Sequence, residues 1–194
     1  RQIARDTLAQ DREYAFDRRV GLYRGETSFL DWREQSYPAW TRDDTRYIAG
    51  SFALSTNVLH YVALRDAADL ERDAEPRHAA ELDGEAEVLR QQINARFWRE
   101  RDGLYSSYLG ADLVPTAAHD LLGLALAVIH GVADERRGRS ILSHYPATDA
   151  GPPVIWPEQP SVPIYHNRAI WPFVTAYALE AARRARDPAR MSAF

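Results

Sequence analysis

The sequence predicts an all-α fold built from repeated helical hairpins. Three segments are apolar on nearly every side, a pattern typical of buried helices, and they cover residues 47–70, 121–133 and 170–182. Three other segments are amphipathic and are expected to cover the buried ones, and they cover residues 3–16, 78–98 and 136–145. The two kinds alternate along the chain, and no segment shows sustained strand alternation. About three hairpins, each with an outer and an inner helix, are therefore expected.

The helix boundaries carry the residues that such boundaries favour. Pro76 and Pro172 suit the first turn of a helix, where the backbone N–H that proline lacks has no intrahelical partner. Thr116, which follows Pro115, is the expected N-cap of the second apolar segment. Residues 154–156 are the one stretch expected to be extended.

A short sequence echo supports the repeat. Residues 16–23, FDRRVGLY, recur as residues 97–105, FWRERDGLY. Both copies end an amphipathic helix at a Gly-Leu-Tyr turn. The long loops, 17–44, 99–115 and 146–168, all run from an outer helix to an inner one, so we expect them to gather at one end of the molecule.

Composition excludes several classes of function. The 194 residues carry a net charge of −4 with basic residues scattered among acidic ones, so a nucleic-acid partner is not expected. The longest apolar run, 121–129, is too short for a membrane span, which needs about 20 residues. There is no cysteine, and no HExxH or nucleotide-binding glycine motif is present. His119 and His130 fit hydrogen-bonded core positions better than a metal site. No metal and no cofactor are therefore expected.

Both ends of the chain look cut, because it opens inside a predicted helix and stops after another. Residues 1–194 are therefore expected to form a single all-α catalytic-domain fragment of a longer polypeptide. All basic residues other than histidine are arginine, which, with the many alanines, suggests a GC-rich bacterial genome. The sequence leaves the compartment open between bacterial cytoplasm and periplasm.

The first long loop concentrates carboxylates and aromatic rings. Asp31 lies between an apolar pair and Trp32, where desolvation would raise its pKa and suit a general acid. Arg33, Glu34 and Trp40 follow closely. Two structural alternatives remain: the neighbouring glutamates could brace the loop on arginines, and Asp31 could be an N-cap or an arginine partner.

The third long loop is stiffened by prolines and is also rich in aromatic and amide groups. Such a loop suits the binding of a sugar, whose ring faces stack on aromatic side chains and whose hydroxyls pair with polar ones. The alternative is that its two tryptophans are core plugs. The candidate site residues of this loop are Trp156, Glu158, Tyr165, His166, Asn167 and Trp171.

At these two loops the chain resembles the six-hairpin glycosidases, the (α/α)6 toroid enzymes that include trehalases, processing α-glucosidases and glycogen-debranching-like hydrolases. GETSFLDWRE, residues 25–34, is similar to the trehalase-type loop that supplies the general acid, although four residues separate Glu26 from Asp31 where that loop has three. YHNRAIWPFVTAYAL, residues 165–179, is similar to the aromatic entry of a later inner helix in this superfamily.

The resemblance implies about three hairpins of a six-hairpin ring and the activity of a glycoside hydrolase. Asp31 would be the general acid, with Glu34 as the alternative acid. The base would be a glutamate outside these 194 residues, with Glu158 as the best resident candidate. The expected substrate is a carbohydrate, cleaved with inversion at an α-glucosidic or similar linkage. The walls of the site would be Trp32, Arg33, Trp40, Trp156, Tyr165, His166, Asn167 and Trp171.

Two other functions fit the same fold prediction. A sugar epimerase or isomerase on the same toroid would use several histidines that converge on the central funnel. A helical-repeat scaffold would bind protein partners along an open array, and it would leave the carboxylate-rich loop unexplained.

Overall fold

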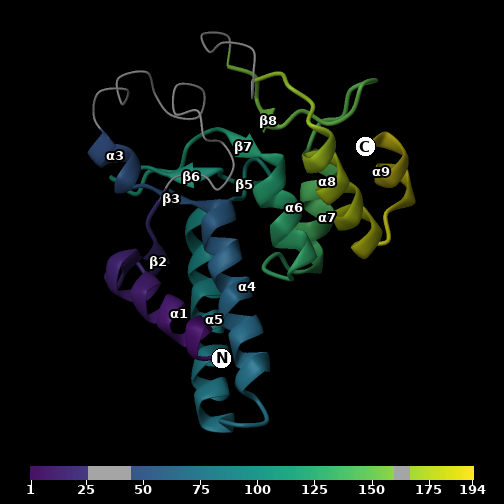
Figure 1. Cartoon of the computed structure of the whole chain (residues 1–194). Helices are drawn as coiled ribbons and strands as arrows, with labels where there is room; N and C mark the ends of the chain where they lie inside the picture. The colour runs from purple at the N-terminus through teal and green to yellow at the C-terminus, as the bar shows by residue number, and fades with distance from the viewer. Residues whose placement is uncertain (26–44, 160–166) are drawn as a thin grey trace.

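The computed structural model describes residues 1–25, 45–159 and 167–194. Helices dominate, and the inner ones are the three apolar segments of the sequence (Figure 1). The inner helices are α4 (Leu54–Glu71), α6 (Leu121–Ile129) and α8 (Pro172–Arg184). The outer helices are α1 (Gln2–Tyr14), α5 (Pro76–Phe97) and α7 (Glu135–His144), and two short helices are α3 (Thr45–Ala49) and α9 (Pro188–Ala193).

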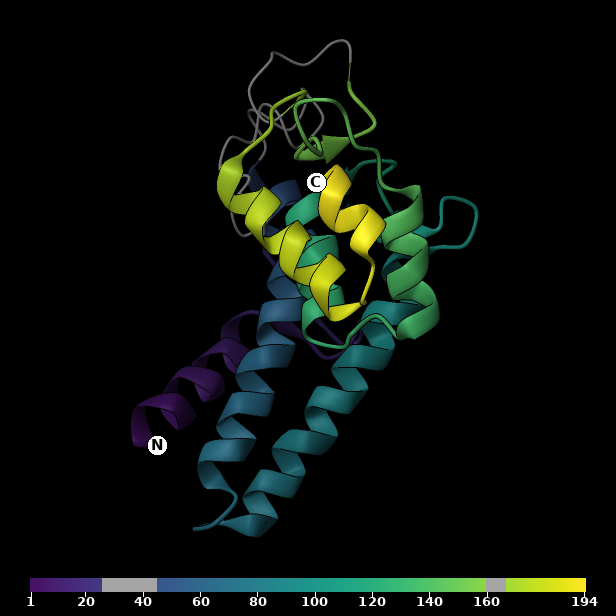
Figure 2. The same ribbon diagram turned by 90° about the vertical axis from the view of Figure 1, so that its right-hand side faces the viewer.

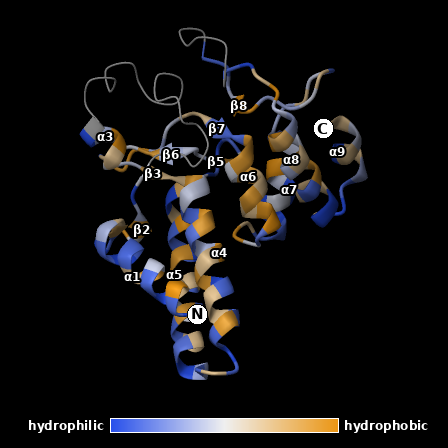
Figure 3. Cartoon of the chain, viewed as in Figure 1, coloured by the Kyte–Doolittle hydropathy of each residue, from blue (hydrophilic) through white to orange (hydrophobic). Residues whose placement is uncertain are grey.

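The inner helices lie side by side, with α6 packed between α4 and α8 (Figure 2). All residues of α6 except Val128 are buried, and this helix is mostly orange in the hydropathy view (Figure 3). The outer helix α5 packs along α4 and buries one stripe at helical spacing. The predicted alternation of outer and inner helices is thus confirmed. As expected, Pro76 and Pro172 lie in first turns.

Short strands are more numerous than the sequence predicts. Extended structure at 154–156 is confirmed as β8 (Ile155–Trp156), but it is one of several strands of two residues. The antiparallel pairs are β1 (Phe16–Asp17) with β2 (Leu22–Tyr23), β3 (Phe52–Ala53) with β6 (Tyr108–Leu109), β4 (Trp98–Arg99) with β5 (Leu104–Tyr105), and β7 (His119–Asp120) with β8. Two residues are too few to produce a detectable alternation.

The expectation of one continuous helix over 47–70 is wrong. Strand β3 separates α3 from α4, because Phe52 and Ala53 pair with β6 and are held extended. Gly50 lies in the break, where a Cβ would stand 3.1 Å from the Arg46 carbonyl oxygen and 3.2 Å from the Ala111 Cβ.

The sequence echo is a repeated β-hairpin, with a register shifted by one residue at its start. Phe16 pairs with Tyr23 and Trp98 pairs with Tyr105, so the counterpart of Phe16 is Trp98 and not Phe97. The turn ends each time at a glycine with positive φ, +75° at Gly21 and +66° at Gly103. That conformation favours glycine over residues with a side chain.

Main-chain hydrogen bonds repeat where each loop meets an inner helix. The N–H groups of Gly25, Ser107 and Val154 donate to the carbonyls of Ser51, Ala118 and Ala169, at 2.9, 2.8 and 2.8 Å. Each acceptor lies three residues before the first residue of an inner helix. The described ends of the long loops therefore meet at one end of the molecule, as expected, and we call it the loop end (Figure 1).

Buried Asn57 fastens the first hairpin to α4. Its Oδ1 accepts from the Tyr23 N–H at 2.8 Å, and its Nδ2 donates to the carbonyls of Tyr23 and Ala53, both at 2.9 Å. The side chain has no exposed surface. One amide therefore satisfies three buried main-chain groups.

Replacing Gly103 by Ala is expected to lower the free energy of unfolding by about 1–3 kcal/mol. Its φ is +66°, and a Cβ would stand 2.7 Å from the Ser140 Oγ. Gly84 offers a matched control, because it lies inside α5 with nothing within 4 Å of its Cβ position. Gly84→Ala should raise the free energy by about 0.5–1 kcal/mol. Urea denaturation measures both, and equal effects at the two sites would contradict the assigned turn.

Candidate functional site

The described ends of the two predicted sugar-binding loops lie at the loop end. The first leaves the structure at Gly25 and returns at α3, and the third leaves at Gln159 and returns at Asn167. Seven predicted site residues fall outside the described parts and stay predictions: Asp31, Trp32, Arg33, Glu34, Trp40, Tyr165 and His166.

Trp156 is an exposed aromatic side chain at this end. It belongs to β8, where it pairs with His119 of β7. Pairing fixes its backbone, while 41% of the residue stays open to solvent. The alternative that Trp156 is a core plug does not fit this exposure. An exposed indole on a fixed strand suits stacking against a sugar ring.

Glu158 lies two residues further on and is paired with Arg168. The hydrogen bond from this guanidinium lowers the pKa of Glu158. The carboxylate is therefore ionised at neutral pH, as a base must be, but its pairing with arginine makes it a weaker base. Its role as the resident candidate base stays a prediction.

The amide of Asn167 is engaged with the main chain. Its Oδ1 accepts from the Gln159 N–H at 2.8 Å, and its Nδ2 donates to the Gln159 carbonyl at 2.8 Å. Asn167 is buried, so it ties together the two described ends of the third loop. Trp171, just before α8, is half-buried against the main core and against the Phe173 ring, with centroids 5.8 Å apart. The two predicted tryptophans thus occupy different environments.

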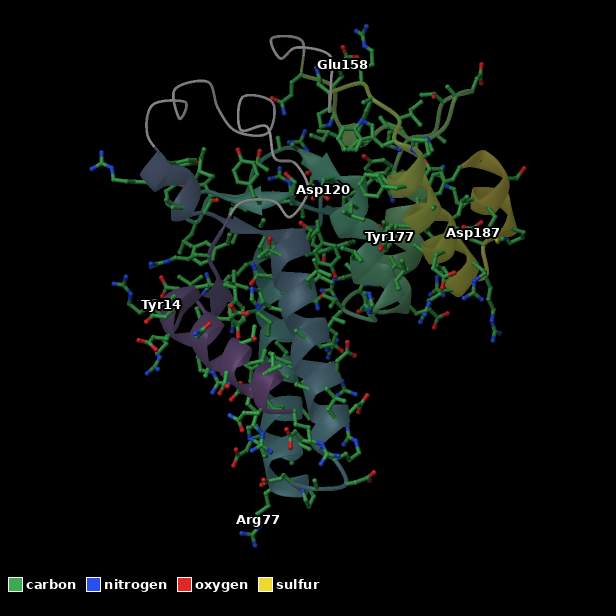
Figure 4. All side chains as sticks on the ribbon, in the orientation of Figure 1. Tyr14, Arg77, Asp120, Glu158, Tyr177 and Asp187 are labelled. Carbon is green, nitrogen blue, oxygen red and sulfur yellow. The ribbon has the colours of Figure 1, made fainter. Side chains whose placement is uncertain are left out.

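Asp120 is a buried carboxyl that the sequence interpretation missed. It caps α6, where its Oδ1 accepts from the Gly123 N–H at 2.6 Å. The expected cap, Thr116, is wrong, because β7 continues the extended chain to Asp120. An aspartate directly before the apolar run was the available signal. Figure 4 shows Asp120 at the loop end of α6.

The second oxygen of Asp120 has no hydrogen-bond partner in the described structure. Gly123 allows this close packing, since a Cβ there would stand 2.8 Å from Oδ2. Burial raises the pKa of Asp120 to about 6, against the opposing hydrogen bonds from main-chain N–H groups. The carboxyl is therefore partly protonated in mildly acidic solution.

Asp120 is expected to make stability depend on pH. Because its folded-state pKa lies above that of the unfolded chain, its contribution is full below pH 4 and is lost as the pH rises to about 6. Relative to an Asp120→Asn variant, the wild type should lose up to about 3 kcal/mol between pH 4 and pH 7. The variant retains an oxygen for the Gly123 N–H. Denaturation at several pH values measures the difference, and parallel pH profiles would contradict it.

His119, beside Asp120, is buried as expected, and it is held by the β4–β5 hairpin. Its Nδ1 is 2.8 Å from the Tyr105 carbonyl oxygen, so this nitrogen carries the proton. Its Nε2 is 3.7 Å from the Asp102 Oδ2. Burial lowers the pKa of His119. This arrangement positions β7 and leaves the His119 ring buried.

Within 1–25, 45–159 and 167–194, no group of three His, Asp or Glu side chains is arranged to hold a metal ion. In the same ranges, no helix combines the length and the apolar character that crossing a bilayer requires.

The element order and the repeated junctions define a class of fold, a repeat of helical hairpins with short strands at the loop end. Two solved structures of that class are similar to the chain. Neutral trehalase from Saccharomyces cerevisiae matches with a TM-score of 0.61 and 16% identity, over 73% of this chain and 29% of that one. The GH78 family rhamnosidase of Bacillus sp. GL1 matches with a TM-score of 0.64 and 20% identity, over 97% of this chain and 17% of that one.

The chain thus spans less than a third of each solved structure that it matches here. No protein-family model matches the sequence, and no curated protein matches it either. The likeness confirms the fold that the resemblance implies: repeated helical hairpins that form part of a toroid.

Proposed function

We propose that this chain is part of a glycoside hydrolase that cleaves an α-glucosidic or similar linkage with inversion. The observation that carries the proposal is the meeting of the described ends of the long loops at one end of a helical-hairpin array whose fold is similar to that of a trehalase and a rhamnosidase. Exposed Trp156 on β8 supports it, because an aromatic face at that end suits a sugar ring.

In the proposed mechanism, Asp31 protonates the glycosidic oxygen as the bond to the anomeric carbon breaks. A carboxylate on the opposite face takes a proton from water, and that water attacks the anomeric carbon. Inverting glycosidases hold the two carboxyl groups about 6.5–9.5 Å apart so that the water fits between them. We assign the base to a glutamate in the remainder of a longer polypeptide, with Glu158 as the resident candidate.

The other residues of the candidate site have separate roles in this proposal. Trp156 and Trp32 stack on sugar rings, while Arg33 pairs with hydroxyls or with the general acid. Asn167 acts through the main chain of Gln159, whose N–H and carbonyl it binds. It is a positioning residue for the third loop.

Trp156→Ala tests the substrate-binding end. It is expected to raise KM for an α-linked disaccharide about two- to tenfold, because stacking on an aromatic ring contributes about 0.5–1.5 kcal/mol. Trp156→Phe, which keeps an aromatic face, should retain most of the affinity. Leu59→Ala is the matched control, since Leu59 is also exposed (42%) but lies on α4.

The assay uses the full-length protein and a panel of α- and β-linked glycosides, with released sugar as the readout. An unchanged KM in Trp156→Ala would remove this residue from the site. Conversion of a free sugar to its epimer without bond cleavage would replace the hydrolase by an isomerase on the same fold.

A further inference from the structure

A cavity opens beside the β1–β2 turn, on the side of the outer helices. Its volume is about 540 Å³, and it lies between the β1–β2 turn, the last turn of α5 and the segment that follows β6. Phe52 and Leu113 contribute apolar walls, and Asp17, Arg19, Arg24 and Arg96 contribute charge. None of the described residues of the candidate site, Trp156, Glu158, Asn167 and Trp171, lines this cavity.

Asp17 is the one carboxylate among the described residues that line the cavity, and both of its oxygens already accept hydrogen bonds. The Asp17 Oδ1 accepts from the N–H groups of Arg19 at 2.9 Å and Val20 at 3.3 Å, and Oδ2 accepts from the Arg24 guanidinium. Burial by itself would raise the pKa of Asp17, but the Arg19 N–H and the Arg24 guanidinium outweigh burial and lower it. Asp17 and Arg24 therefore neutralise each other.

Two cations in the cavity remain uncompensated. The Arg19 guanidinium is 3.9 Å from Asp17, whose charge Arg24 already balances, and 89% of its side chain is exposed. The half-buried Arg96 uses only its Nε, which donates to the Gln92 Oε1 at 3.1 Å. Its two terminal nitrogens have no hydrogen bond or ion pair in the described structure. A planar guanidinium with two free donors matches the geometry of an oxyanion.

The repeat architecture holds Arg96 in place beside the turn. Gly21 of the β1–β2 turn lies so close to α5 that a Cβ there would stand 3.0 Å from the Gln92 Cγ. Gln92 in turn holds the Arg96 Nε one helical turn later. The turn, the amide and the guanidinium thus form one side of the cavity, which the exposed Arg19 also lines.

We propose that this cavity binds the phosphate group of a small phosphorylated ligand. Arg96 would grip the oxyanion with its two terminal nitrogens, Arg19 would add a second positive charge, and the apolar walls formed by Phe52 and Leu113 would accept the body of the ligand. The excess of two positive charges in the wall favours an anion, although the chain as a whole carries a net charge of −4.

Titration with inorganic phosphate by calorimetry, at constant ionic strength set with chloride, tests the proposal. Arg96→Gln should weaken phosphate binding about ten- to a hundredfold, because it removes charge-assisted hydrogen bonds. Arg96→Lys keeps the positive charge but not the planar guanidinium, so its loss of phosphate affinity should be smaller. This second variant also keeps the test valid if Arg96→Gln fails to fold. Arg77→Gln is the matched control, since Arg77 is an exposed arginine at the far end of the molecule (Figure 4).

A phosphorylated hexose, compared with inorganic phosphate and with the unphosphorylated hexose, identifies the source of the phosphate group. Tighter binding of the phosphorylated hexose would assign the apolar walls to the sugar body, and equal binding would assign the cavity to phosphate alone. Equal phosphate affinity in wild type and Arg96→Gln, or a chloride effect of the same size, would overturn the proposal. Because the readout is binding, the result is independent of glycoside hydrolysis.

Discussion

An Asp31→Asn variant is expected to turn over a glycoside with a natural sugar leaving group about 100-fold or more slowly than the wild type. A sugar alkoxide is a poor leaving group, so cleavage requires a proton at the glycosidic oxygen as the bond breaks. Asparagine keeps the size of the side chain and removes the proton. Steady-state kinetics of the full-length protein measure kcat for both.

Two matched variants separate this role from the structural alternatives. Glu34→Gln removes the alternative acid from the same loop, and Asp112→Asn removes an exposed carboxylate near β6 whose Oδ1 accepts from the Val114 N–H. Both should retain kcat within severalfold. Full activity in Asp31→Asn combined with a large loss in Glu34→Gln would move the general acid to Glu34.

An Asn57→Ala variant is expected to lose at least about 3 kcal/mol of unfolding free energy. The substitution leaves the Tyr23 N–H and the carbonyls of Tyr23 and Ala53 without their partner inside the fold. Each buried polar group left unpaired costs about 1–3 kcal/mol. Urea or thermal denaturation measures the loss.

Gln91→Ala is the control for Asn57→Ala. The Gln91 side chain also forms a hydrogen bond, to the Glu87 Oε1 at 3.0 Å, but on the exposed face of α5. Its loss should change stability by less than about 0.5 kcal/mol. A loss below about 1 kcal/mol in Asn57→Ala would show that the first hairpin is not held through this amide.

The helices were predictable because each has a strong local signal. The stripe on α5 that includes Leu82, Leu89 and Ile93 is buried as its spacing indicates. Segment 121–133 is apolar except for His130, and α6 within it is the most buried of the described helices. Hairpin order and the gathering of the loops followed from the alternation of these two patterns.

The short strands and the helix caps were not predictable in the same way. Phe52 and Ala53 are extended because they pair with residues more than fifty positions away. No window of sequence around them contains that partner. Thr116 looked like a cap by local rules, but the pairing of Asp120 with Ile155 moved the helix start by several residues.

The gathering of the described loop ends was predictable, whereas the surroundings of single side chains were not. The loop end follows from the topology, and Trp156 is exposed there. Asn167 was expected to bind substrate, and its amide is engaged with Gln159. The cavity around Arg96 depends on packing between a turn and a helix about seventy residues apart. Such a juxtaposition leaves no trace in the local sequence.

The anomeric configuration of the first sugar released tests the central claim most directly. Proton NMR of the full-length protein acting on an α-linked glucoside follows the product before mutarotation. We expect bond cleavage with initial release of the β-anomer, because a single displacement by water inverts the anomeric centre. Initial release of the α-anomer would contradict inversion, and the absence of cleavage across α- and β-linked substrates would contradict a glycosidase site at the loop end.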